Sequence, residues 1–270
     1  ASQAVQAFME DIFRANSANA PDPVRARQAT AGELLDAATK RIGPELTEAP
    51  EVKLRLIDTL LSLQRDLGRH AEQIALAEQG LQLARETHGD ASAAVAERQL
   101  VLSEALQDGA RLEDAGHAAE QAGAQLDRLG VVDGPLRGKL ELRLGNLARS
   151  GYKVKGDEQD HLERAVELLR PGGPSYELSE ALYGWADHLG GIDDQARSAR
   201  AIQEAIACCQ SVPGTRIRLP AMYAVLSRIR EAEMDFPGHV AALEKAFEVA
   251  MGLHETYPSA ALWAGADLAF

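Results

Sequence analysis

The sequence predicts an all-α fold built from repeated pairs of antiparallel helices. Each predicted pair consists of two apolar segments of helical period around a short break with Gly or Asp. Aromatic residues make up only 4% of the chain against 46% hydrophobic residues, and Ala and Leu fill the difference, which suits closely packed helices. Six anchor leucines recur at intervals of 42, 42, 38, 44 and 42 residues: Leu60, Leu102, Leu144, Leu182, Leu226 and Leu268.

Two segments come before the first helical cap. The helical spacing of apolar residues from Val5 to Phe13 predicts a helix over 1–14. The polar stretch that follows contains two prolines and predicts a linker over 15–29. The repeats therefore begin well inside the chain.

A capping segment is predicted over 30–50. Thr30 and Glu33 have the spacing of a capping box, in which each side chain bonds the backbone N–H of the other residue. The helix that they begin is expected to end before Gly43 and Pro44.

The helix pairs are predicted to follow Pro50. Turns inside the pairs are expected at Gly68, Asp108–Gly109, Gly151, Gly190–Gly191 and Pro237–Gly238. Asp90 and the pair Asp193–Asp194 are expected to cap second-repeat and fourth-repeat helices, and an expanded turn is expected over 152–160. The resulting repeats are 51–89, 90–132, 133–173, 174–218, 219–257 and an incomplete 258–270.

Charge and composition exclude several classes of function. A net charge of −13 and a pI near 5.0 disfavour nucleic acid and anionic lipid as partners. No apolar run approaches the roughly 20 residues that span a bilayer. Cys208 and Cys209 are adjacent in a predicted helix, where their side chains diverge, so no disulfide is expected between them.

The repeat units resemble the tetratricopeptide repeat (TPR). The resemblance rests on residues of repeats one, three and five: Ile57, Leu60, Leu61, Gln64, Leu67, Gly68, His70, Ile74, Gly80, Leu144, Gly145, Phe236, Ala246 and Phe247. It implies a right-handed superhelical solenoid of about five and a half repeats plus N-terminal helices, with small residues where paired helices approach.

The front of the chain resembles the stretch after the membrane span of bacterial serine/threonine protein kinases with TPR sensor regions. The matching residues lie between Phe8 and Leu54: Phe8, Met9, Asp11, Ile12, Phe13, Arg14, Thr30, Ala31, Glu33, Leu34, Leu35, Asp36, Ala37, Arg41, Ile42, Glu45, Leu46, Pro50, Glu51, Val52 and Leu54. The resemblance implies a periplasmic, non-catalytic sensor region that regulates an attached kinase and meets the membrane only through a segment outside this chain. A second copy of the chain, in a homodimer, is a further candidate partner. A cytoplasmic TPR adaptor and the ligand-binding half of a transcriptional regulator are the alternatives to the sensor.

No chemical centre is predicted in this chain. The sequence has no Gly-rich phosphate loop, His-Arg-Asp catalytic loop or Asp-Phe-Gly metal site of a kinase. None of its seven histidines has the spacing of a HExxH metal site. We therefore expect no catalytic residue, no metal and no cofactor, and a protein or peptide as the ligand.

The TPR resemblance places the ligand in a concave groove lined by the first helices. Counting from the anchor leucines predicts these groove residues: Arg55, Asp58, Ser62, Leu100, Glu104, Lys139, Asn146, Glu180, Gly184, His188 and Arg228. In the carboxylate-clamp form of the family, Lys and Asn occupy the places of Asp58 and Ser62, so capture of a C-terminal carboxylate is not expected. The mixed, partly acidic groove favours a segment of basic character.

Overall fold

The computed structural model describes residues 30–45, 50–212 and 215–254, and these residues form helices and turns without a strand. The fold class is therefore all-α, as predicted. The helices are α3 (Ala31–Glu45), α4 (Pro50–Asp66), α5 (His70–His88), α6 (Ala93–Asp108), α7 (Leu112–Arg128), α8 (Gly134–Arg149), α9 (Glu158–Leu169), α10 (Tyr176–Gly191), α11 (Gln195–Ser211), α12 (Leu219–Ala232) and α13 (Phe236–His254), with short 3-10 turns η1 (Arg170–Gly172) and η2 (Arg216–Arg218). The predicted segments 1–14, 15–29 and 258–270 lie outside the described residues.

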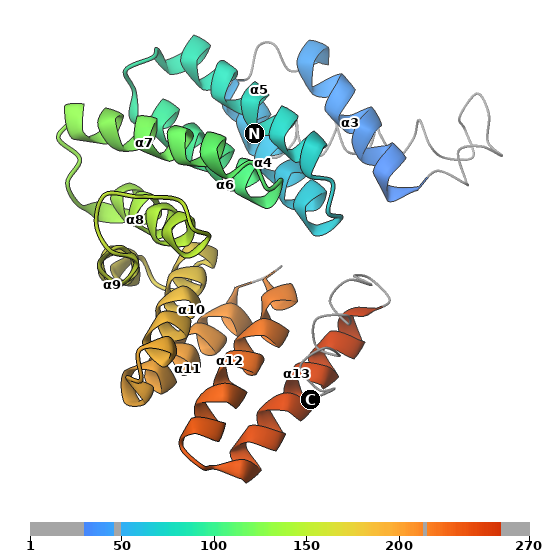
Figure 1. The fold of residues 1–270 in the computed structure, drawn as a ribbon. Coiled ribbons are helices and arrows are strands. Elements are labelled where there is room, and N and C mark those ends of the chain that lie inside the picture. Colours follow the sequence, from blue (N-terminus) through green and yellow to red (C-terminus); the bar gives the residue numbers. More distant parts are fainter. Residues whose placement is uncertain (1–29, 46–49, 213–214, 255–270) are drawn as a thin grey trace. The chain divides into compact units, whose positions relative to one another are not determined.

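The chain forms two compact units, one up to Gln125 and one from Leu126. In unit 1, α3, α4, α5 and α6 pack in sequence order, and α7 joins α6 through the Ser103 hydroxyl, which donates to the Ala115 carbonyl at 2.7 Å. In unit 2, each helix from α8 to α13 packs on the next, and α10 also contacts α8 and α12 (Figure 1). Each unit is therefore a stack of antiparallel helix pairs.

The same backbone motif ends the first helix of every pair. A residue with φ between 58° and 91° follows the helix, and the next N–H donates to the carbonyl five residues back at 2.8 to 3.0 Å, which is a Schellman motif. The left-handed residues are Gly68, Ala110, Gly151, Asp193 and Met234. Their spacing alternates between 42 and 41 residues, so this turn marks the structural period more evenly than the anchor leucines do.

Small residues lie where the two helices of a pair approach closely. A Cβ added at Gly145 on α8 would lie 2.6 Å from Leu162 Cδ2 on α9. Leu162 is fully buried, so it has little room to move away. The predicted role of Gly145 in packing is thereby explained by a specific contact.

Of three helix caps predicted from the sequence, two are confirmed and one is wrong. The Thr30 amide donates to the Glu33 carboxylate at 2.8 Å and the Glu33 amide to the Thr30 hydroxyl at 3.2 Å, which is the predicted capping box. Asp194 caps α11 as predicted. Asp90 does not cap α6, because the helix begins later and Ser92 accepts from the Val95 amide.

Several glycines and prolines that were predicted to lie in turns lie inside helices instead. Helix α3 continues through Gly43 and Pro44 to Glu45, since a proline in the last turn removes only one hydrogen bond. The pair Gly190–Gly191 lies in the last turn of α10 rather than in the turn itself.

The remaining two differences concern helix starts. Pro237 and Gly238 lie in the first turn of α13, where the missing proline N–H has no helical partner to lose. The turn before α13 is instead at 233–235. The expanded turn of repeat three is shorter than predicted, because α9 begins at Glu158.

The core of unit 2 is continuous across its helix pairs. Buried apolar residues from α8 to α12 form one cluster, in which Leu162, Leu182 and Ile202 are fully buried. Cys208 and Cys209 belong to the same cluster as free thiols, and burial raises the pKa of both. Both cysteines therefore act as small apolar side chains of the core.

Candidate protein-binding surface

The eleven predicted groove residues lie on the first helices of the pairs. In unit 1, Arg55, Asp58 and Ser62 are on α4, and Glu104 and the buried Leu100 are on α6. In unit 2, Lys139 and Asn146 are on α8, Glu180, Gly184 and His188 are on α10, and Arg228 is on α12. Each unit is described separately below.

In unit 1, ion pairs connect the first helices of successive pairs. The Arg98 guanidinium on α6 donates to both carboxylate oxygens of Asp58 on α4. Arg65 on α4 lies 3.1 Å from the Glu104 carboxylate on α6. Two predicted site residues thus hold α4 and α6 together.

Two other site residues of unit 1 make local contacts. The Ser62 hydroxyl donates to the Thr59 carbonyl one turn earlier, at 2.8 Å. Arg55 is exposed on α4. Neither contributes to the ion pairs between α4 and α6.

Ion pairs also connect the first helices of unit 2. Lys139 on α8 lies 3.3 Å from the Glu177 carboxylate at the start of α10. Glu180 on α10 accepts from Arg218 on η2, and Arg228 on α12 donates to Asp187 on α10 at 2.6 Å. The acidic helix α10 is therefore held on both sides by basic residues of its neighbours.

Two site residues of unit 2 lie apart from these ion pairs. His188 Nδ1 lies 3.4 Å from the Glu158 carboxylate on α9, a second helix. Asn146 is mostly buried, and its side-chain oxygen accepts from Arg149 at 3.5 Å. The predicted set is therefore only partly brought together.

Tyr183 on α10 lies among the ion pairs of unit 2. It was not among the groove residues predicted from the sequence. The Arg149 guanidinium lies 6.0 Å from the centre of the Tyr183 ring. Burial and the nearby Asp187 carboxylate raise the pKa of the phenol, while Arg149 and Arg218 oppose the shift. Tyr183 lies three residues after Glu180 and four before Asp187, so helical spacing could have placed it with them.

One groove residue predicted on α10, Gly184, is buried, and an added Cβ there would lie 3.3 Å from Leu162 Cδ2. Its neighbour Tyr183 is the partly exposed residue.

The charge of the first helices in unit 2 differs from that of the whole chain. Helix α8 carries four basic residues and one acidic residue, α10 carries three acidic residues, and η2 with α12 carries four basic and one acidic. Together these helices have a net charge of +3 within a chain of −13. The charge of these elements of unit 2 is therefore opposite in sign to that of the whole chain.

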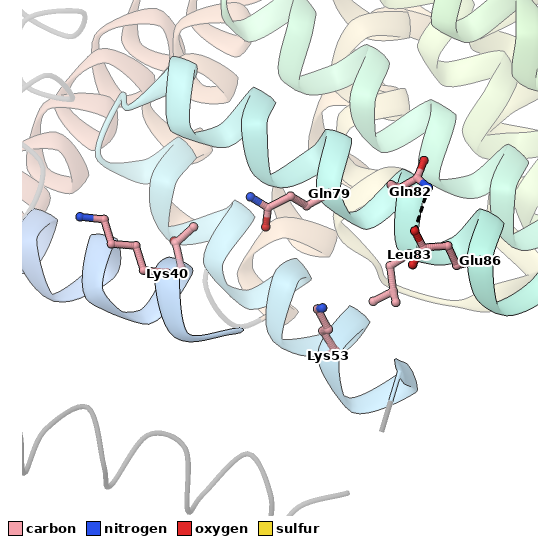
Figure 2. Close-up of a pocket in the computed structure, with 7 residues that line it drawn as sticks. Lys40, Lys53, Gln79, Gln82, Leu83 and Glu86 are labelled. Atoms are coloured by element: carbon pink, nitrogen blue, oxygen red, sulfur yellow. Dashed lines mark hydrogen bonds between the residues drawn. The ribbon is translucent and has the colours of Figure 1, made fainter. Parts of the chain in front are cut away.

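A hollow of about 430 Å³ lies in unit 1 between α3, α4 and α5. Figure 2 shows the Gln82 amide, which donates to the Glu86 carboxylate at 2.8 Å on α5, and Lys40 and Lys53 on the other two helices. Within 30–45, 50–212 and 215–254, no group of three His, Cys, Asp or Glu side chains could hold a metal ion. No helix in the same ranges is long and apolar enough to cross a bilayer.

Known structures show the same architecture at low sequence identity. BtubC (BKLC) from P. vanneervenii is 16% identical, with a TM-score of 0.60 over 84% of this chain and 93% of that one. The fold is TPR-like. A kinesin light chain protein of Podosopora anserina with nearly identical TPR-like repeats gives 17% identity and a TM-score of 0.51, over 78% of this chain and 99% of that one.

A third structure, the apo form of RapI, is 13% identical with a TM-score of 0.51, and the match covers 87% of this chain and 69% of that one. No family model and no curated protein sequence matches the chain. At these identities the likeness concerns the TPR-like fold alone.

Proposed function

We propose that this chain is a non-catalytic, protein-binding region that uses the first helices of unit 2 as its contact surface. The observation that supports this most is the group around Tyr183, whose ring lies 6.0 Å from the Arg149 guanidinium and whose phenol also feels the charge of Arg218. Tyr and Arg are the residue types enriched at the energetic centres of protein interfaces. The ring is held by packing, so it loses little side-chain entropy on binding.

The partner proposed is a peptide or protein segment with acidic residues beside an apolar side chain. The net charge of +3 on α8, α10, η2 and α12 favours acidic residues. An apolar side chain would pack on the exposed part of Tyr183. The basic segment expected from the sequence is less favoured by this surface.

We further propose that the chain is the periplasmic sensor region of a bacterial membrane-bound serine/threonine kinase. The support is the resemblance of the residues between Phe8 and Leu54 to the stretch after the membrane span in such kinases. Binding of a partner to unit 2 would shift the equilibrium between conformational states of the kinase domain on the other side of the membrane.

The test is kinase autophosphorylation by the parent protein carrying Arg149→Glu. The substitution reverses the charge beside Tyr183, and its matched control is Arg164→Glu on the second helix α9. Signal-dependent phosphorylation that is lost only with Arg149→Glu supports the sensor role. A parent protein without a membrane span, or one with a DNA-binding helix-turn-helix, would contradict it in favour of an adaptor or a regulator.

A further inference from the structure

One position of the first helices is apolar in every described pair except the first. It lies 15 residues before the left-handed turn residue of its pair and is occupied by Val95, Leu136, Leu178 and Leu219, counted back from Ala110, Gly151, Asp193 and Met234. Val95, Leu178 and Leu219 are at most 4% exposed. In the first pair the same position, counted back from Gly68, is Lys53 on α4.

The apolar residue at this position contacts the helix that precedes its pair. In unit 1, Val95 on α6 packs with the buried Leu81 on α5. The helix that precedes α4 is α3, and the two pack on each other. There Thr39 and Lys40 of α3 line a hollow together with Lys53, in place of an apolar contact. A local departure from the packing rule of the other pairs is where a functional site is expected.

Helix α3 is fixed in place close to this hollow. The Arg69 guanidinium, in the turn between α4 and α5, donates to the Gly32 carbonyl at 2.9 Å and to the Asp36 carboxylate at 2.8 Å. Thr39 and Lys40 follow Asp36 by about one turn of α3. Because α3 is held there, the hollow is formed in advance and a ligand loses less free energy in ordering it.

The residues around the hollow favour an anion with a hydrocarbon part. Lys40 and Lys53 bring two positive charges, and Glu86 brings the single negative charge among the described lining residues, within a chain of net charge −13. The Glu86 carboxylate already accepts from the Gln82 amide (Figure 2). Leu83 and the methylene stems of the lysines supply an apolar wall.

We propose that this hollow of unit 1 binds a small organic dicarboxylate. One carboxylate pairs with Lys40 on α3, the other pairs with Lys53 on α4, and the hydrocarbon between them packs on Leu83 of α5. The volume of about 430 Å³ lies in the range of small-molecule sites. The hollow shares no residue with the surface proposed in unit 2, so the two proposals are independent of each other.

Titration of the isotope-labelled chain with adipate, followed by NMR at constant ionic strength, tests the proposal. We expect saturable shifts of the Gln79 and Gln82 side-chain amides, which line the hollow, and none with 1,6-hexanediol, which has the same carbon chain without the charges. Lys53→Leu should weaken adipate binding about tenfold. Without adipate it should raise the melting temperature, because it restores the apolar residue of the other pairs. Lys245→Leu, at an exposed position of α13, is the control for loss of one charge and should leave the binding of adipate unchanged.

Three results would overturn the proposal. The first is the absence of saturable shifts at Gln79 and Gln82, or equal shifts with 1,6-hexanediol. The second is equal affinity for adipate in Lys53→Leu and the unmodified chain. The third is a lower melting temperature for Lys53→Leu, because the lysine would then be part of the fold and not of a ligand site. Lys40→Gln, at an exposed position of α3, provides a second variant that should weaken binding with little effect on the fold.

Discussion

The ring of His161 lies between two oxygen acceptors that both require a donated proton. Its Nδ1 is 2.6 Å from the Glu141 carboxylate on α8, and its Nε2 is 2.9 Å from the Lys155 carbonyl in the turn before α9. A neutral imidazole has only one N–H, so both contacts are satisfied only by the protonated ring. Arg137 also donates to Glu141, at 2.9 Å, and to Asp127.

This geometry predicts a pH-dependent part of the stability. The hydrogen bond to Glu141 raises the pKa of His161 above its ordinary 6.5, despite burial. The stabilisation is therefore complete below pH 6.5 and is lost as pH rises through the raised value in the folded protein. Urea unfolding across this range measures the loss, and His161→Gln should remove this contribution to the pH dependence.

The pKa of Glu141 determines the lower end of the pH range in which its pair with His161 stabilises the protein. Its pKa is lowered from 4.5 by His161 and Arg137, which overcome the opposing effect of burial. Its stabilisation is present above pH 4.5 and is lost as pH falls through the lowered value. Amide hydrogen exchange of residues 150–157 should be slowest at pH values between the lowered pKa of Glu141 and the raised pKa of His161. Equal exchange at pH 5.5 and pH 9, measured after correction for the intrinsic pH dependence of exchange, would contradict the role given to His161.

Met234→Gly should stabilise the protein by about 1 kcal/mol. Met234 has a φ of 60° and is 77% exposed, so the substitution relieves backbone strain and loses little packing. Met234→Leu is the matched control, since it keeps a Cβ in the left-handed region and should give no gain. Chemical denaturation of the two variants decides, and a stabilising Met234→Leu would argue against strain as the cause.

Gly145→Ala should destabilise the protein by about 1 to 3 kcal/mol, because its Cβ would overlap the buried Leu162. The double variant with Leu162→Val should recover part of that loss relative to the two single variants. Gly172→Ala is the control, since nothing lies within 4 Å of a Cβ there. Additive single effects in the denaturation cycle would exclude the contact as the cause.

Arg218→Ala should cost more stability than Arg228→Ala. Removing Arg218 leaves the Glu180 side chain, only 6% exposed, without its ion-pair partner, at a cost of about 2 to 4 kcal/mol. Arg228 is 67% exposed and its partner Asp187 is 27% exposed, so its removal should cost about 0 to 1 kcal/mol. Denaturation of both variants in the same buffer compares them, and equal losses would contradict the difference in burial.

The sequence predicted the helix pairs because their signal is local and repeated. Apolar residues at helical spacing and the capping box of Thr30 and Glu33 depend on neighbours within one or two turns. The turn residues were harder, since Ala110, Asp193 and Met234 adopt the left-handed conformation that favours glycine. Residue type therefore does not reveal which of these positions are left-handed. Gly190 and Gly191 could adopt this conformation easily, but they lie inside helix α10.

The candidate surface was only partly predictable. The first helices were correctly found, but a groove position depends on register, and an error of one residue moves a side chain about 100° around the helix. Gly184 was predicted although it is buried, and the neighbouring Tyr183 was not. Partners such as Arg218, 38 residues from Glu180, become visible only when the pairs are stacked.

The most direct measurement of the proposed function is site-specific photo-crosslinking in cells of the parent protein. A benzophenone side chain is placed at Tyr183 on α10 in one variant and at Arg164, an exposed residue of α9, in the other. We predict one discrete crosslinked protein at position 183 that is lost when Arg149→Glu is added, and none at position 164. The same crosslinks at both positions, or none at position 183 in cells with an active parent protein, would contradict a binding surface on the first helices of unit 2.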